Sequence, residues 1–189
     1  MIKNTDTMKY TLKTLQNSQD NLKYLLFWGH RPGRDGEITS SCFSQWWPCE
    51  FNHNDILYKS SEHWMMAEKA RLFNDFKIEE EIIRSDSAAK AKALGRKVKG
   101  FDPIVWDENK YEIVKKGNLL KFSQNSELKS FLIGTYNRIL TEASPVDPIW
   151  GIRLAADHKD ARNPSKWKGE NLLGFALMEV RDELQNYTS

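Results

Sequence analysis

The sequence predicts a mainly α-helical fold, a single multihelical domain with a small β hairpin or sheet near its N-terminus. Helical periodicity and helix-capping residues recur from residue 60 to residue 185, whereas most of the short apolar runs typical of strands come before residue 60. A chain of 189 residues, 40% of them hydrophobic, can bury a full core, and no repeat or linker divides it. We expect a polar N-terminal arm over residues 1–20, either loose or an added strand, and one domain over residues 21–189.

The first part of the domain carries the expected strands. The apolar run 22–28 is typical of a strand, and residues 30–40 contain Pro32, Gly33 and Gly36, which indicate a loop. Two further runs, 43–51 and 56–58, flank a polar turn and predict a hairpin.

The remainder is predicted from helix caps and helix terminators. Ser60 and Ser61 begin a helix that reaches about residue 73, and Asp86 or Ser87 begins one that ends near Gly95. Asp107 is the expected cap of a long helix to about residue 122, interrupted by Gly117. The other expected segments are helices over 76–84, 127–133 and 172–185, an extended segment over 139–144 and a loop over 145–169.

Composition limits the function. Lys and Arg number 28 and Asp and Glu number 26, so a net charge of +2 gives no electrostatic case for tight, sequence-independent nucleic-acid binding. The aromatic residues include seven Trp, several of them beside polar residues in expected loops, where aromatic rings can flank a planar ligand.

Cysteine usage and the lack of a recognisable targeting segment predict a soluble cytoplasmic protein. Cys42 and Cys49 have no zinc-ligand spacing, and we expect free thiols in a reducing cytoplasm rather than one bridge. The N-terminus lacks the apolar stretch of a signal peptide, and no run reaches the roughly 20 apolar residues that span a bilayer. The four His are scattered and no glycine-rich phosphate loop is present, so no metal, cofactor or membrane partner is expected.

The segment 60–70 contains the most informative pattern. On a helix, Glu62, Met66 and Lys69 share one face, with Glu62 and Lys69 roughly 10 Å apart along the axis. A carboxylate there could transfer protons, and a lysine of lowered pKa could attack a sugar aldehyde carbon. The residue types alone favour a plainer interpretation, a first-turn carboxylate and a solvated lysine.

Two further segments have the composition of ligand sites. Asp147 and Trp150 stand in a proline-rich loop, where they could bind ribose hydroxyls and stack on a base, or form a structural turn pinned by a buried ring. Arg96 lies in a basic run from Lys90 to Lys99 and could bind a phosphate, although such runs are usually solvated helix faces.

Taken in chain order, these segments resemble the NADAR family of YbiA-like N-glycosidases. The resemblance covers about residues 25–184 and implies the multihelical fold of that family. It lies in Phe27-Trp28-Gly29, Phe43-Ser44-Gln45-Trp46, the segment 58–73, the segment 89–96 ending in Leu94-Gly95-Arg96, Lys121-Phe122, the segment 142–151 and the segment 171–181.

The resemblance implies hydrolysis of a bond between ribose and nitrogen. The favoured substrates are phosphorylated ribosylamino-pyrimidine intermediates of riboflavin biosynthesis. One alternative is removal of ADP-ribose from guanine in nucleic acid, and another is a binding module that holds ADP-ribose without turnover. Oligomeric state is left open.

The resemblance also assigns roles to residues. Lys69 would form a Schiff base, Glu62 would move protons, and Asp147 would hold ribose hydroxyls or stabilise the cationic intermediate. If water attacks directly, Glu62 and Asp147 become a two-carboxylate pair. Asn171 either caps the last helix or touches substrate. The expected substrate-binding residues are Phe27, Ser44, Trp46, Arg96, Trp106, Trp150, Gly151 and Asn171.

Overall fold

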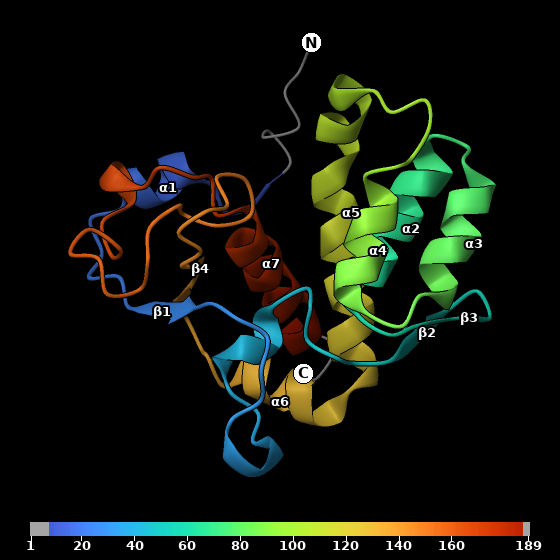
Figure 1. The fold of residues 1–189 in the computed structure, drawn as a ribbon. Helices are drawn as coiled ribbons and strands as arrows, with labels where there is room; N and C mark the ends of the chain where they lie inside the picture. Colours follow the sequence, from blue (N-terminus) through green and yellow to red (C-terminus); the bar gives the residue numbers. More distant parts are fainter. Residues whose placement is uncertain (1–7, 187–189) are drawn as a thin grey trace. The chain divides into compact units, whose positions relative to one another are not determined.

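The computed structural model describes residues 8–186, which form a mainly helical protein with four short strands (Figure 1). The mainly α prediction is therefore confirmed. The described residues divide into two compact units: the first comprises residues 8–44 and 127–186, and the second comprises residues 45–126.

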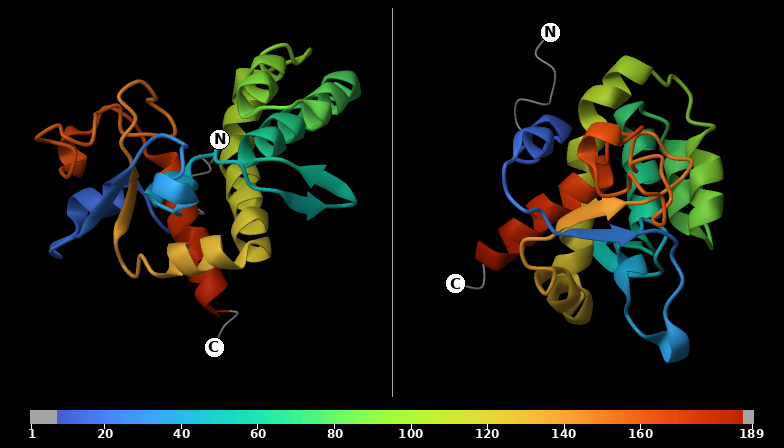
Figure 2. Two further views of the ribbon diagram at one scale, coloured as in Figure 1. Left: turned by 60° about the horizontal axis from the view of Figure 1, so that its bottom comes forward. Right: turned by 90° about the vertical axis from the view of Figure 1, so that its left-hand side faces the viewer.

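The first unit contains a parallel pair of strands. β1 (Tyr24–Phe27) runs beside β4 (Ile139–Glu142), with Tyr24 opposite Ile139 and Phe27 opposite Glu142 (Figure 2). Its helices within the described residues are α1 (Leu12–Asn17), α7 (Leu172–Asn186) and all but the first residue of α6 (Ser126–Ile133). Within the expected arm over residues 1–20, residues 12–17 form a short helix, whose first turn the Thr11 side chain caps. Residues 1–7 of that arm lie outside the described residues.

The second unit is a helical layer with a hairpin. α2 lies beside α3, α4 and α5 (Figure 1), and β2 pairs with β3 in antiparallel fashion (Figure 2). The expected strand at 43–51 is mostly absent, since residues 40–43 form a 3₁₀ turn and the strand begins only at Phe51. The elements are β2 (Phe51–His53), β3 (Ile56–Tyr58), α2 (Ser61–Leu72), α3 (Phe76–Arg84), α4 (Ala88–Gly95) and α5 (Pro103–Gln124).

The long helix α5 begins earlier than the sequence predicts. Asp102, not Asp107, is its cap, because the Asp102 carboxylate accepts hydrogen bonds from the backbone N–H groups of Ile104 and Val105 at 2.7 and 3.3 Å. Pro103 follows at the first helical position, where its missing N–H costs nothing. The helix also continues through Gly117 without interruption.

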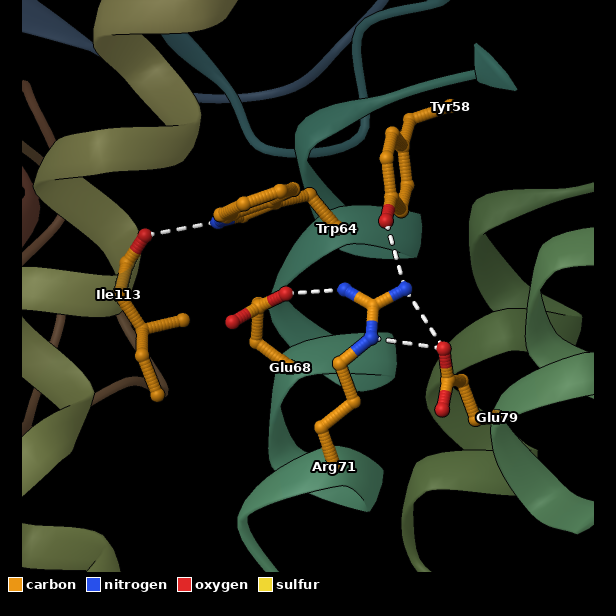
Figure 3. Close-up of polar contacts among 6 residues, drawn as sticks. All are labelled: Tyr58, Trp64, Glu68, Arg71, Glu79 and Ile113. Atoms are coloured by element: carbon orange, nitrogen blue, oxygen red, sulfur yellow. Dashed lines mark hydrogen bonds and ion pairs between the residues drawn. The ribbon is translucent and has the colours of Figure 1, made fainter. Parts of the chain in front are cut away.

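Two glycines let α2 pack closely against its neighbours. A Cβ on Gly117 of α5 would lie 2.3 Å from Cδ1 of Trp64, and a Cβ on Gly95 of α4 would lie 2.1 Å from Sδ of Met66. Trp64 is 1% exposed, and its indole N–H donates to the carbonyl of Ile113 at 2.8 Å (Figure 3). Gly117 is therefore a packing requirement of α5 rather than a helix terminator.

Arg71, in the last turn of α2, ties the helix to α3 and β3. Its guanidinium donates to Glu79 Oε1 at 2.7 Å and to the Tyr58 hydroxyl at 2.8 Å, and it forms an ion pair with Glu68 (Figure 3). Planar guanidinium groups suit such forked contacts. This network and the glycine contacts fix the helix that carries Glu62 and Lys69.

No helix within residues 8–186 has the length and apolar content needed to cross a membrane. The same part of the chain contains no group of three or more His, Cys, Asp or Glu side chains placed to hold a metal ion. Both cysteines are buried free thiols.

Candidate active site

Glu62 lies in the first turn of α2 and is only 2% exposed. Its backbone N–H donates to the carbonyl of Gln45 at 2.9 Å, and the Gln45 side chain donates to Asn118 Oδ1 at 3.2 Å. The cap of α2 is Ser60, whose hydroxyl accepts from the N–H of His63. Because Glu62 is buried, it is not the solvated first-turn carboxylate of the plainer interpretation.

Two buried side-chain oxygens in the described part of the chain lack hydrogen-bond partners, one on Ser61, which precedes Glu62, and one on Gln45, which bonds the Glu62 backbone. Among residues 8–186, Gln45 Oε1 and Ser61 Oγ are buried side-chain atoms with no hydrogen-bond partner. Buried polar atoms are usually satisfied, so each such atom calls for an explanation. Both can hydrogen-bond a hydroxyl group of a small polar ligand, Gln45 as an acceptor and Ser61 as a donor or an acceptor.

Lys69 lies two turns after Glu62 on the same helix, which places the two residues roughly 10 Å apart along the axis. Its Nζ donates to the carbonyl of Gly95 at 3.0 Å and lies 4.1 Å from the ring centroid of Phe101 and 5.6 Å from that of Trp106. Burial of the amine lowers the pKa of Lys69 below its usual value. This lysine is therefore not a solvated charge, and more of it is neutral and nucleophilic near neutral pH than of an exposed lysine.

Three further predicted residues lie in the same unit as Lys69. Arg96 follows Gly95 as the C-cap of α4 and is exposed. Lys92, one turn earlier on the same helix, has its Nζ 5.6 Å from the ring centroid of Trp46. Trp106 is half-buried in the first turn of α5. The second unit thus holds Glu62, Lys69, Trp46, Arg96 and Trp106.

The other predicted residues lie in the first unit. Asp147 organises its loop, because its Oδ1 accepts hydrogen bonds from the N–H groups of Ile149 and Trp150 at 2.9 and 2.8 Å. Trp150 is half-buried and its carbonyl accepts from the N–H of Leu173, which joins the loop to the start of α7. Gly151 is buried where a Cβ would lie 2.8 Å from the carbonyl oxygen of Glu142.

Asn171 neither caps α7 with its side chain nor faces solvent. It is fully buried; its Oδ1 accepts from the N–H of Glu142 at 2.9 Å and its Nδ2 donates to the carbonyl of Leu140 at 3.0 Å. Its backbone has φ +57°, a conformation that Asn adopts more readily than most residues. Asn171 therefore bonds the edge of β4 to the loop before α7.

Phe27 and Ser44 lie at the ends of their elements. Phe27 closes β1, is 2% exposed and packs edge-on against Phe43 with ring centroids 5.4 Å apart, so it belongs to the core of the first unit. Ser44 is half-buried, and its N–H donates to the carbonyl of Ser41.

Three residues that the structure connects to Glu62 and Lys69 are not among the site residues that the sequence predicts. Gln45 and Gly95 stand inside segments that resemble the family, yet their backbone carbonyls carry the contacts, and a carbonyl leaves no signal in a residue type. Phe101 precedes the cap of α5, and in the sequence it is only one apolar residue among many. Its ring contacts Lys69, a residue 32 positions earlier in the chain.

Comparison with known proteins places the chain in a family. The model of the NADAR domain matches residues 26–185, so the chain belongs to the NADAR domain family. It is 43% identical over 168 residues to N-glycosidase R617 of Acanthamoeba polyphaga mimivirus, covering 86% of this chain and 97% of the relative. It is 31% identical to N-glycosidase YbiA of Escherichia coli (strain K12), covering 73% and 76% of the two chains.

Two further comparisons concern another named relative and a solved structure. The chain is 31% identical to the riboflavin biosynthesis protein VVA0006 of Vibrio vulnificus, over 76% of this chain and 35% of that protein. The NMR structure of the E. coli protein YbiA superposes with a TM-score of 0.69 at 26% identity, covering 92% of each chain. The predicted family and its multihelical fold are both confirmed.

Proposed function

We propose that this protein is an N-glycosidase, a hydrolase that cleaves the bond between the anomeric carbon of a ribose and a nitrogen atom. The observation that carries the proposal is the pair on α2, a buried carboxylate at Glu62 and a half-buried amine of lowered pKa at Lys69. Titratable groups perturbed by burial are typical of catalytic sites. The names of the mimiviral and E. coli relatives support the same chemistry.

The substrates we favour are phosphorylated ribosylamino-pyrimidine intermediates of riboflavin biosynthesis. One relative is named a riboflavin biosynthesis protein, which supports this choice. The net charge of +2 suits a small phosphorylated substrate better than a polynucleotide. In this proposal Arg96 binds the phosphate, and Trp46 and Trp106 flank the sugar or the base. The two buried free thiols support a reducing cytoplasm as the site of action.

The proposed reaction passes through a lysine adduct. The neutral amine of Lys69 attacks the anomeric carbon of the ring-opened sugar, and Glu62 protonates the departing nitrogen. The base leaves as a free amine, and a protonated Schiff base joins the sugar to Lys69. Water then adds to that carbon while Glu62 takes its proton, and Lys69 departs as a neutral amine. One water is consumed and nothing is oxidised or reduced.

A direct attack by water is the competing mechanism. In that mechanism Glu62 would activate the water, and the role of Asp147 as a second carboxylate stays a prediction of the family resemblance. In the structure Asp147 Oδ1 accepts two backbone hydrogen bonds, which supports a second role for this carboxylate in holding the loop that contains Trp150. Trapping of an adduct at Lys69 separates the two mechanisms.

A second candidate function is removal of ADP-ribose from guanine in DNA or RNA. The observation that favours it is a group of three exposed basic residues, Arg96, Lys97 and Lys99, which directly follow the end of α4. Such a local patch can guide a polyanion even when the net charge is small. A third candidate, of another class, is a module that binds ADP-ribose without turnover.

One experiment separates the three. The purified protein and its Glu62→Gln variant are given a phosphorylated ribosylamino-pyrimidine and an ADP-ribosylated guanine oligonucleotide, and release of the free base is measured. We expect release from the pyrimidine substrate, reduced about 100- to 10,000-fold in Glu62→Gln. Glu81→Gln, an exposed acid on α3, is the matched control and should keep full activity. Release from the oligonucleotide alone would select the second function, and release from neither would leave the binding module.

A further inference from the structure

The end of the Lys69 side chain lies among groups that prefer a positive charge. Lys69 Nζ lies 4.1 Å from the ring centroid of Phe101 and 5.6 Å from that of Trp106. The same Nζ donates a hydrogen bond to the carbonyl of Gly95. Gly95 is the last residue of α4, so this carbonyl is at the negative end of the helix dipole. Aromatic faces attract cations through their quadrupole. All of these residues belong to the second unit.

We propose that Phe101, Trp106 and the Gly95 carbonyl form a cation seat, which holds the nitrogen of Lys69 both as the resting ammonium and as the protonated Schiff base with substrate. The proposal rests on the proposed function and adds positioning residues to it. A protonated Schiff base keeps one N–H and one positive charge on the same nitrogen. That N–H can donate to Gly95, while the planar cation lies over the Phe101 face.

The arrangement suits a reacting group better than a purely structural contact. Phe101 is 43% exposed, so one side of the seat is open to solvent and to a ligand. Its ring also makes an edge-on contact with Phe73, with the two ring centroids 5.3 Å apart. Burial lowers the pKa of Lys69, so part of the lysine is the neutral amine that can attack. The seat acts at the next step, because it stabilises the positive charge of the adduct once the adduct has formed.

The test is the pH profile of Phe101→Leu. Leu keeps the apolar cover but removes the aromatic face, so both cationic forms of the nitrogen should lose their proton more easily. We expect both limbs of the kcat profile to move to lower pH by about 0.4 to 0.7 units, the shift that an exposed cation–π contact corresponds to. Phe101→Tyr should restore the wild-type profile. Phe76→Leu, which removes an aromatic residue 64% exposed on α3, should leave it unchanged.

A second readout does not depend on turnover. The pKa of the Lys69 amine is measured by competitive labelling with acetic anhydride across pH and mass analysis of the peptide that contains it. We expect a lower pKa in Phe101→Leu than in wild type, and a value equal to wild type would overturn the seat. If wild type shows no adduct at Lys69 with substrate but the labelling shift is present, the Schiff base has failed and the resting seat remains. An adduct at Lys69 with superimposed pH profiles would reject the seat and leave the proposed function standing.

Discussion

The Nζ of Lys69 lies 3.0 Å from the carbonyl oxygen of Gly95, and this hydrogen bond joins α2 to the last turn of α4. The same glycine accommodates Met66, whose Sδ occupies the space that a Cβ on Gly95 would need. Gly95 of α4 thus contacts α2 at two residues, Met66 and Lys69, and helps to position the helix that carries the candidate catalytic pair.

Gly95→Ala should destabilise the protein. The new Cβ would lie 2.1 Å from Sδ and 2.9 Å from Cγ of Met66, and overpacking of this kind costs about 1–3 kcal/mol. Urea unfolding gives the free energy. Adding Met66→Ala should recover part of the loss that Gly95→Ala causes, because the clash is removed. Ala93→Ser, on the exposed side of α4, is the control; a Gly95→Ala protein as stable as this control would contradict the packing argument.

Two substitutions of Asp147 separate its structural role in the loop from its proposed chemical role. Asp147→Asn keeps the oxygen that accepts from Ile149 and Trp150, so its stability should stay near that of wild type. Asp147→Ala loses both hydrogen bonds and should unfold about 1 kcal/mol more easily. If the negative charge stabilises a cationic intermediate, Asp147→Asn should lose activity while remaining stable. Full activity in Asp147→Asn would show that the residue acts only through its loop.

Asn171 should prove essential for stability. Asn171→Gly allows the backbone at φ +57° but removes the bonds to Glu142 and Leu140, leaving buried backbone groups unsatisfied. We expect a loss of about 2 kcal/mol or more in thermal or urea unfolding. KM should change little if Asn171 does not touch substrate. A variant of normal stability with a raised KM would reverse this assignment.

His63 should make the protein less stable in acid. Burial lowers the pKa of His63 below its ordinary value of 6.5, so the unfolded chain binds this proton more tightly than the folded one. The free energy of unfolding should therefore fall as pH drops below about 6.5, until the folded pKa is passed. His63→Asn can keep the contact with Ser60 and should flatten this slope. His158→Asn, an exposed histidine, serves as the control, and an unchanged slope in His63→Asn would reject the assignment.

The sequence predicts the local parts of this fold well. The helix over Ser61–Leu72 follows from its Ser60 cap, and the helix from Ala88 to Gly95 from its Ser87 cap, because caps and periodicity are local signals. The start of α5 is less certain from sequence, because Asp102 and Asp107 are both suitable caps. The proline after Asp102 is the signal that decides between them.

The tertiary contacts of the site could not be predicted in the same way. The shared face of Glu62 and Lys69 follows from helical spacing, but the burial of Glu62 depends on packing from other elements. The aromatic ring beside Lys69 comes from a residue before α5, and nothing in either segment specifies the pairing. Backbone carbonyls such as that of Gly95 carry no side-chain signature, so their roles appear only in three dimensions.

Chemical trapping at Lys69 tests the central claim most directly. The protein is incubated with phosphorylated ribosylamino-pyrimidine, reduced with borohydride, digested and analysed by mass spectrometry. Lys77→Arg, at an exposed site on α3, should give the same adduct as wild type, whereas Lys69→Arg keeps a positive charge but cannot form a Schiff base. We predict a reduced sugar adduct on Lys69, and no adduct or turnover in Lys69→Arg. Full base release by Lys69→Arg would contradict the account.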